Sequence, residues 1–162
     1  ILGSEIHFHI IEPDKTHHIN GFDVTPQELN HAGRAFGFRI ERGGRRVVYA
    51  SDAEHKPEMI SENYAYVDFI HEADVLIFDA QYSLAEATCV KEDWGHSSNV
   101  VGVELALLGS VKHILFFHHE PLNDDHRLDQ IVREARRIEE IMRRGNAVLR
   151  ITGAHDGLDL KL

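Results

Sequence analysis

The sequence predicts a mixed α/β (α+β) domain in which a β-sheet is flanked by helices. Three observations lead to this fold class. Up to about residue 50, short segments alternate between apolar and polar residues and are joined by polar or glycine-rich turns, which is typical of antiparallel strands. Beyond that point, continuous apolar runs alternate with helical patterns. These runs end directly at ionisable residues, as expected of an α/β fold with a site at the ends of its strands.

The composition is that of one domain, with 43% hydrophobic and 27% charged residues among 162. No run approaches the roughly 18 apolar residues of a membrane span, and no signal peptide is visible. The single cysteine, Cys89, excludes an internal disulfide and predicts a reducing, cytoplasmic compartment. A net charge of −10 argues against a surface that follows nucleic-acid phosphates. The 13 histidines prompt a search for a metal site.

The first third of the chain is predicted to be antiparallel β-structure. Residues 6–11 alternate like a strand, residues 12–20 are expected to form a polar turn, and residues 22–25 a second short strand. Residues 36–41 alternate cleanly and are followed by two glycines and the β-branched run that begins at residue 47. Two glycines between two such runs predict a β-hairpin.

The remainder is predicted to contain buried strands and helices in turn. Residues 57–73 form an irregular stretch closed by a short helix, residues 75–78 a buried strand, and residues 82–93 a loop. Ser97 and Ser98 are both candidates for the N-cap of a helix that extends to Leu108.

The last third is predicted to be a strand, a long helix and a final strand. Residues 114–117 form a buried strand. Either Asp124 or Asp125 caps the long helix, whose apolar residues share one face and which ends at Gly145. Residues 147–151 are the last predicted strand.

Five ionisable residues stand at the boundaries of these elements: His31, Asp52, Asp79, His96 and His118. A carboxylate at the end of a strand is held rigidly at the rim of a sheet, although for Asp52 alone an Asx turn is the simpler interpretation. Imidazole nitrogens and carboxylate oxygens are ligands that zinc, manganese and iron accept, and a carboxylate can bridge two ions. The pattern as a whole indicates a metal site.

The same segments resemble the C-terminal half of the metallo-β-lactamase superfamily, and most closely its tRNase Z-like and cyclic-nucleotide phosphodiesterase-like branch. The resemblance rests on five segments in the order found in that family. They are Asn30-His31-Ala32-Gly33, Tyr49-Ala50-Ser51-Asp52, Val75-Leu76-Ile77-Phe78-Asp79, Trp94-Gly95-His96-Ser97-Ser98 and Phe116-Phe117-His118-His119.

This resemblance implies a centre of two divalent metal ions, with zinc favoured over manganese or iron. It makes His31 a ligand of one ion, His118 a ligand of the other, and Asp52 the bridge between them. His96 would protonate the leaving oxygen of the substrate, and Asp79 would orient it. His119 could exchange with His118 if the strand register shifted by one residue.

The sequence departs from the family at its most characteristic motif. The His-any-His-any-Asp-His cluster is missing, and His7 and His9 are interpreted as alternating strand residues. We therefore expect the chain to be a single domain that forms the second half of an αββα sandwich. Without the first half, it should bind metal weakly, and it should self-associate or pair with the missing half.

The resemblance implies a metal-dependent hydrolase, and the spacing of the motifs narrows its substrate. Only 20 residues separate His31 from Asp52, which leaves no room for a long RNA-binding arm. Together with the acidic charge, this favours a small phosphodiester or cyclic nucleotide and makes folded RNA an unlikely substrate. A lactone or ester hydrolase, or a non-catalytic binding module that keeps half of the fold, are the alternatives.

Overall fold

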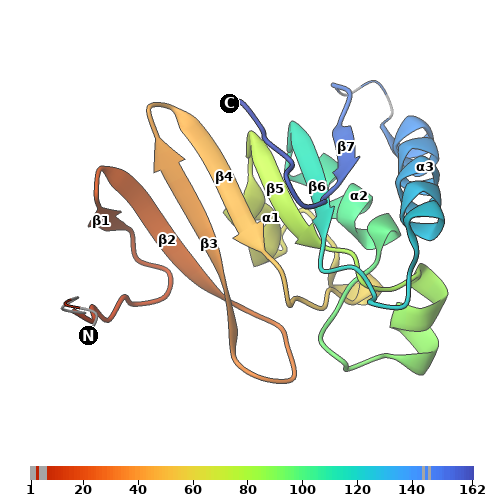
Figure 1. Ribbon diagram of the computed structural model, residues 1–162, viewed down its shortest axis with the longest axis horizontal. Coiled ribbons are helices and arrows are strands. Elements are labelled where there is room, and N and C mark those ends of the chain that lie inside the picture. Colours follow the sequence, from red (N-terminus) through yellow and green to blue (C-terminus); the bar gives the residue numbers. More distant parts are fainter. Residues whose placement is uncertain (1–2, 4–6, 144, 146) are drawn as a thin grey trace.

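A seven-stranded sheet organises the computed structural model, which describes residues 3, 7–143, 145 and 147–162 (Figure 1). Its strands lie side by side in the order of the chain. They are β1 (His17–Ile19), β2 (Phe22–Leu29), β3 (Ala35–Arg42), β4 (Arg45–Ala50), β5 (Val75–Asp79), β6 (His113–Phe117) and β7 (Arg150–Gly153). The mixed sheet and its flanking helices confirm the predicted fold class.

Strand direction decides where the sheet can carry a site. Strands β1 to β4 are antiparallel neighbours, whereas β4 to β7 are parallel. As a consequence β2, β4, β5 and β6 all end at the same edge of the sheet. Four of the five predicted site residues lie at or just beyond the ends of these strands, so the topology gathers them at one edge.

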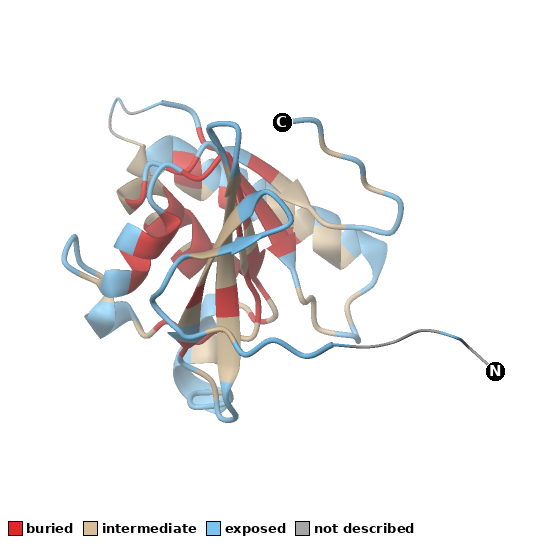
Figure 2. Ribbon diagram, turned by 90° about the vertical axis from the view of Figure 1, so that its left-hand side faces the viewer, coloured by how far each residue is buried: buried red, intermediate tan, exposed pale blue. Residues whose placement is uncertain are grey.

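Three helices pack on one face of the sheet: α1 (Ala65–Ile70), α2 (Asn99–Leu108) and α3 (Asp125–Met142) (Figure 1). The core lies between this face and the helices, where the buried residues gather (Figure 2). Alternate residues of the central strands, including Leu76, Phe78 and Phe116, are fully buried there. Within the described residues, no helix is both long and apolar enough to cross a membrane.

The opposite face of the sheet is less well covered. Phe38 and Tyr49 are paired across β3 and β4, and Ile77 lies beside Tyr49 in β5. All three are only half-buried. The C-terminal residues 159–162 line a cavity together with Val75 and His113.

Local signals in the sequence located the hairpin and the helix starts correctly. Arg42 pairs with Arg45 across the turn formed by the two glycines between β3 and β4. Ser98 is the N-cap of α2, and its hydroxyl accepts from the N–H of Val101. Asp124, rather than Asp125, caps α3. In each case the side chain satisfies a backbone group of its own neighbourhood, so the sequence suffices.

The predicted strand over residues 6–11 is wrong for the part that the structure describes. Residue 6 lies outside the described residues, and residues 7–11 belong to no strand. Phe8 and Ile10 are 90% and 96% exposed. Alternation alone does not make a strand when no neighbouring strand supplies hydrogen bonds. His7 and His9 are therefore not strand residues.

Three other observed boundaries differ from the predicted ones, because pairing across the sheet overrides the local sequence pattern. The predicted polar turn over residues 12–20 contains β1, which pairs with β2. Strand β2 continues to Leu29 because it pairs with β3 from Asp23 to Leu29. The last strand lies at Arg150–Gly153 instead of residues 147–151, in register with β6.

Two short helical turns lie in the irregular segments. η1 (Pro57–Met59) precedes α1, in the stretch predicted to be irregular. η2 (Glu86–Val90) is a π-helical turn inside the segment that was predicted to be a loop. Such a turn has no clear apolar periodicity from which it could be predicted.

Candidate active site

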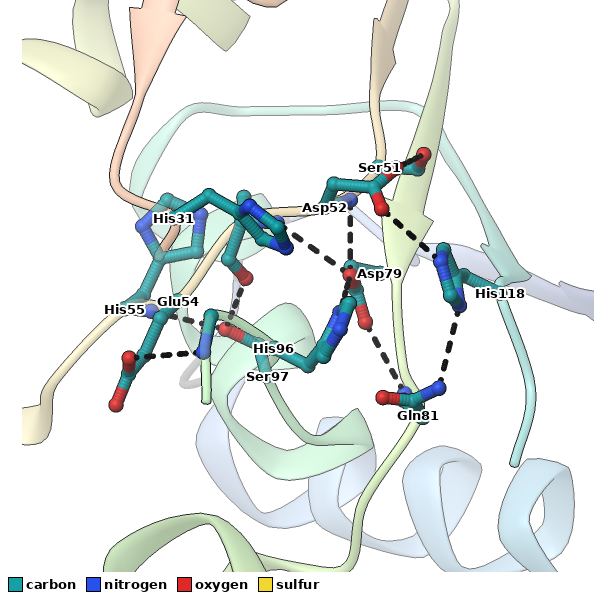
Figure 3. A network of polar contacts seen from close by, with 12 residues as sticks. His31, Ser51, Asp52, Glu54, His55, Asp79, Gln81, His96, Ser97 and His118 are labelled. Atoms are coloured by element: carbon teal, nitrogen blue, oxygen red, sulfur yellow. Dashed lines mark hydrogen bonds and ion pairs between the residues drawn. The ribbon is translucent and has the colours of Figure 1, made fainter. Parts of the chain in front are cut away.

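All five predicted site residues lie close together at the edge where β2, β4, β5 and β6 end (Figure 3). Asp79 is the last residue of β5, and His118 follows β6 directly. His31 and Asp52 each lie two residues beyond a strand, and His96 precedes the N-terminus of α2. The parallel order of the strands therefore brings together residues that are up to 87 positions apart in the sequence (31 to 118).

Asp79 is the hub of the site, and it is fully buried. Its Oδ2 accepts from the backbone N–H of Asp52 at 2.9 Å and lies 2.7 Å from Nδ1 of His96. Its Oδ1 accepts from the N–H of Gln81 at 3.2 Å. One carboxylate thus fixes the turn after β4, the turn after β5 and the ring of His96.

The ring of His96 lies between the other two histidines of the site. Its centroid is 5.2 Å from that of His31 and 4.8 Å from that of His118. The hydrogen bond with Asp79 raises the pKa of His96 and outweighs the opposing effect of burial. Because Nδ1 is held by Asp79, Nε2 is the nitrogen available for a further partner.

Asp52 occupies the turn after β4 in a strained conformation, with φ of 58°. Its Oδ1 lies 3.1 Å from Nε2 of His118, and its Oδ2 accepts from the hydroxyl of Ser51. Burial pushes the pKa of Asp52 up, but the Ser51 hydrogen bond and the neighbouring His118 outweigh it, and the net pKa is lowered. The carboxylate is therefore ionised and ready to act as a ligand at neutral pH.

His118 also has positive φ, 54°, and its ring is held from two sides. Nε2 faces Asp52, while Nδ1 lies 3.4 Å from the side-chain amide of Gln81. The adjacent His119 instead lines a separate cavity beside Val132 of α3. The structure therefore places His118, and not its neighbour, in the site.

His31 approaches the turn that carries His96 very closely. A Cβ atom at Gly95, whose φ is +91°, would lie 2.4 Å from Cδ2 of His31. Nδ1 of His31 accepts from the N–H of Gly33 at 3.1 Å. A cation at Nδ1 would replace this hydrogen bond, and one at Nε2 would require the ring proton to move to Nδ1.

The donor atoms of the site fit a divalent metal centre. Potential ligand atoms of His31, Asp52 and His96 all lie within 4.8 Å of one another, as do those of Asp79, His96 and His118. All are imidazole nitrogens or carboxylate oxygens, the ligands that zinc prefers in proteins. The structure brings these residues together, while the division between ligands and proton donor stays a prediction.

Several residues that shape the site were not predicted. Gln81 contacts His118, and Ser97 accepts from the N–H of His55 while it donates to the carbonyl of Ala53. Glu54 is also buried beside the turn that carries His96. None of these residues belongs to an apolar periodicity, and nothing local marks their distant partners. The only signal in the sequence was proximity: each of the three residues lies one or two positions after a predicted site residue.

A mixed sheet with helices on one face, and with histidine and aspartate side chains gathered where its strands end, defines a protein of the metallo-β-lactamase fold. The family model for the beta-lactamase superfamily domain matches residues 2–119. The chain therefore belongs to this family.

Similar proteins agree with this assignment. A ribonuclease Z of Picosynechococcus sp. is 24% identical over an alignment that covers 85% of this chain and 57% of the ribonuclease. The metallo-β-lactamase-fold protein YhfI from Bacillus subtilis superposes with a TM-score of 0.72 at 20% identity, covering 91% of this chain and 53% of YhfI. A diphosphatase of the PhnP family gives a TM-score of 0.62 at 20% identity, covering 99% of this chain and 51% of the diphosphatase. The chain thus spans little more than half the length of these proteins.

Proposed function

We propose that this chain carries part of the active site of a metal-dependent phosphodiesterase that acts on a small phosphodiester or cyclic nucleotide. The observation that carries the proposal is the pair formed by His96 and the fully buried Asp79, at 2.7 Å, beside Asp52 and His118. When a P–O bond is broken and the leaving group is an alkoxide, the site needs a proton donor for the leaving oxygen. An imidazole held by a carboxylate is suited to that task.

In this proposal, His31, Asp52 and His118 would hold two divalent cations, and the nitrogen and oxygen donors favour zinc. When bound, such cations supply Lewis acidity and lower the pKa of coordinated water. Three protein ligands are few for two cations, so a complete centre requires further donors.

The chain's own residues then divide the remaining work. Asp79 holds Nδ1–H of His96 and fixes the orientation of the ring, which leaves Nε2 to donate a proton to the leaving oxygen. The raised pKa of His96 favours the protonated ring that a general acid requires. Asp79 also accepts from the N–H of Asp52, so the ring of His96 and the backbone of Asp52 are fixed to one side chain.

Two features favour a small substrate. The segment between His31 and Asp52 forms the β3–β4 hairpin, which has a tight turn and no extended arm. The net charge of −10 disfavours a long polyanion.

One similar protein is named a ribonuclease and another a diphosphatase, which favours a phosphoryl substrate over a lactone.

The test compares leaving groups in the protein complete with its metal centre. With zinc or manganese added, we expect hydrolysis of a cyclic nucleotide and of bis(p-nitrophenyl) phosphate. His96→Ala should slow hydrolysis of the cyclic nucleotide by about 10²–10⁴-fold, because the alkoxide leaving group of this substrate needs a proton. The p-nitrophenolate leaving group is weakly basic, so its reaction should slow much less.

Equal losses on both substrates would show that His96 is not the proton donor. Activity on lactones or thioesters alone would reject the phosphodiesterase while leaving the fold intact. Absence of any hydrolysis by the complete, metal-loaded protein would favour a binding module.

A further inference from the structure

Glu54 is a buried carboxylate whose described hydrogen-bond partners are backbone N–H groups. Glu54 is only 6% exposed to solvent. Oε1 accepts from the N–H of Asp93 at 2.9 Å, and Oε2 accepts from the N–H of Gly95 at 3.2 Å. Burying an ionised group costs free energy unless its oxygens are satisfied, so such a residue needs a reason to be where it is.

The same residue is bound to the segment that carries His31. The backbone N–H of Glu54 donates to the carbonyl of Asn30 at 2.8 Å, and its own carbonyl accepts from the side-chain amide of Asn30 at 3.2 Å. Asn30 immediately precedes His31, and Gly95 immediately precedes His96. Glu54 therefore bridges the backbone next to a predicted metal ligand and the backbone next to the predicted proton donor.

The chemistry of these contacts calls for a carboxylate in particular. Each oxygen of Glu54 accepts from a different N–H, and hydrogen bonds to an ionised acceptor are roughly twice as strong as neutral ones. Glutamine has the same shape but only one acceptor oxygen. Its NH₂ group would face one of the two N–H donors and leave that donor unpaired.

We propose that Glu54 is a positioning residue that fixes the turn bearing His96 relative to His31 and Asp52. The geometry of Gly95 supports this assignment, because the turn lies so close to His31 that even a Cβ atom would collide. A turn held this closely cannot shift without moving the ring of His96 or that of His31. The inference rests on the proposed function in one respect: the turn carries the proton donor.

A matched control separates positioning from ordinary stabilisation. Glu139 of α3 is also buried, at 4% exposure, and its Oε1 accepts from the N–H of Leu149 at 3.1 Å. It joins α3 to the segment before β7 and takes no part in the site. Its Oε1 also lies 3.6 Å from Nε of Arg143, so Glu139→Gln removes the charge of a buried carboxylate and its ion pair without touching the turn that carries His96.

Two measurements on Glu54→Gln test the proposal. In the metal-free chain, hydrogen exchange of the Asp93 and Gly95 amides should accelerate, and the NMR signal of the His96 ring should broaden. In the metal-loaded protein, kcat should fall by roughly 10- to 100-fold, the size expected for misplacement of about 1 Å. KM and metal content should stay unchanged. Glu139→Gln should lower stability but leave kcat and the His96 signal as in the wild type.

Retention of kcat by Glu54→Gln, or an unchanged His96 signal, would overturn the proposal. So would an equal loss of kcat in Glu139→Gln. If Glu54→Gln fails to fold, Asn30→Ala loosens the same bridge by one hydrogen bond and should lower kcat several-fold. If the wild type cleaves another ester and no phosphodiester, the proposed function fails. The kcat of Glu54→Gln relative to that of the wild type on this ester then still tests the role of Glu54. If it cleaves nothing, the exchange and NMR results decide.

Discussion

Replacement of Gly95 by alanine should damage the site through His31. The new Cβ would lie 2.4 Å from Cδ2 of His31. Carbon atoms in contact are about 3.5–4.0 Å apart, so one of the two must move by roughly 1 Å or more. In addition, φ at Gly95 is +91°, a region that L-residues adopt only at a cost. The substitution therefore combines backbone strain with displacement of a predicted metal ligand.

The expected loss in the free energy of unfolding is the sum of these two effects. A left-handed backbone costs an L-residue about 1–2 kcal/mol. Turning the His31 ring away from its rotamer adds on the order of 0.5–1.5 kcal/mol. Gly21→Ala is the control, because φ is +79° there and nothing lies within 4 Å of the added Cβ. Gly95→Ala should thus destabilise by about 1.5–3.5 kcal/mol, and Gly21→Ala by about 1–2 kcal/mol.

Urea unfolding of both variants and metal competition against a chelator are the assays. We expect Gly95→Ala to lower metal affinity by roughly 10–100-fold, as disturbance of a ligand's support usually does. Gly21→Ala should leave metal affinity unchanged. In a double-mutant cycle, His31→Ala should relieve the stability cost of the collision but not that of the strain. Equal stability losses and equal metal affinity in the two glycine variants would refute the reasoning.

Three further predictions concern roles, pH and association. Asp52→Ala should lose metal, whereas His96→Ala should keep it and lose turnover; metal analysis of both purified variants would contradict the assigned roles if His96→Ala were the metal-poor one. Burial lowers the pKa of His55 to about 3, against about 6.5 in an unfolded chain. The unfolded state therefore gains a proton first, so stability should be intact above pH ~6.5 and should fall by up to ~1.4 kcal/mol per pH unit as the pH drops towards 3. His55→Phe should flatten this dependence in urea unfolding at several pH values, and an unchanged slope would exclude His55 as its cause. Finally, the bare chain should self-associate through the sheet face that carries the half-buried Phe38 and Tyr49; light scattering from a stable monomer would contradict this.

The elements with local signals were predictable from the sequence. Two glycines between alternating runs specify the β3–β4 hairpin, and the caps Ser98 and Asp124 bond to backbone groups within three residues. The strands that end at Asp79 and near Asp52 were recognisable because buried strands are short apolar runs with a clear stop. The failures lie where pairing with a distant strand decides, as in the exposed residues 7–11 and the late start of β7.

The residues that could form the site were recognisable from the sequence, because metal-binding chemistry requires particular side chains and these stand at the boundaries of predicted elements. Their geometry depends on how the chain folds. Three features of the site join separate segments of the chain. They are the 2.7 Å contact between His96 and Asp79, the position of His118 rather than His119 beside Asp52, and the hydrogen bonds from Glu54 to the turn that carries His96. Such contacts depend on the register and direction of neighbouring strands, and the pattern of residues along one segment carries no information about the segment that will lie beside it.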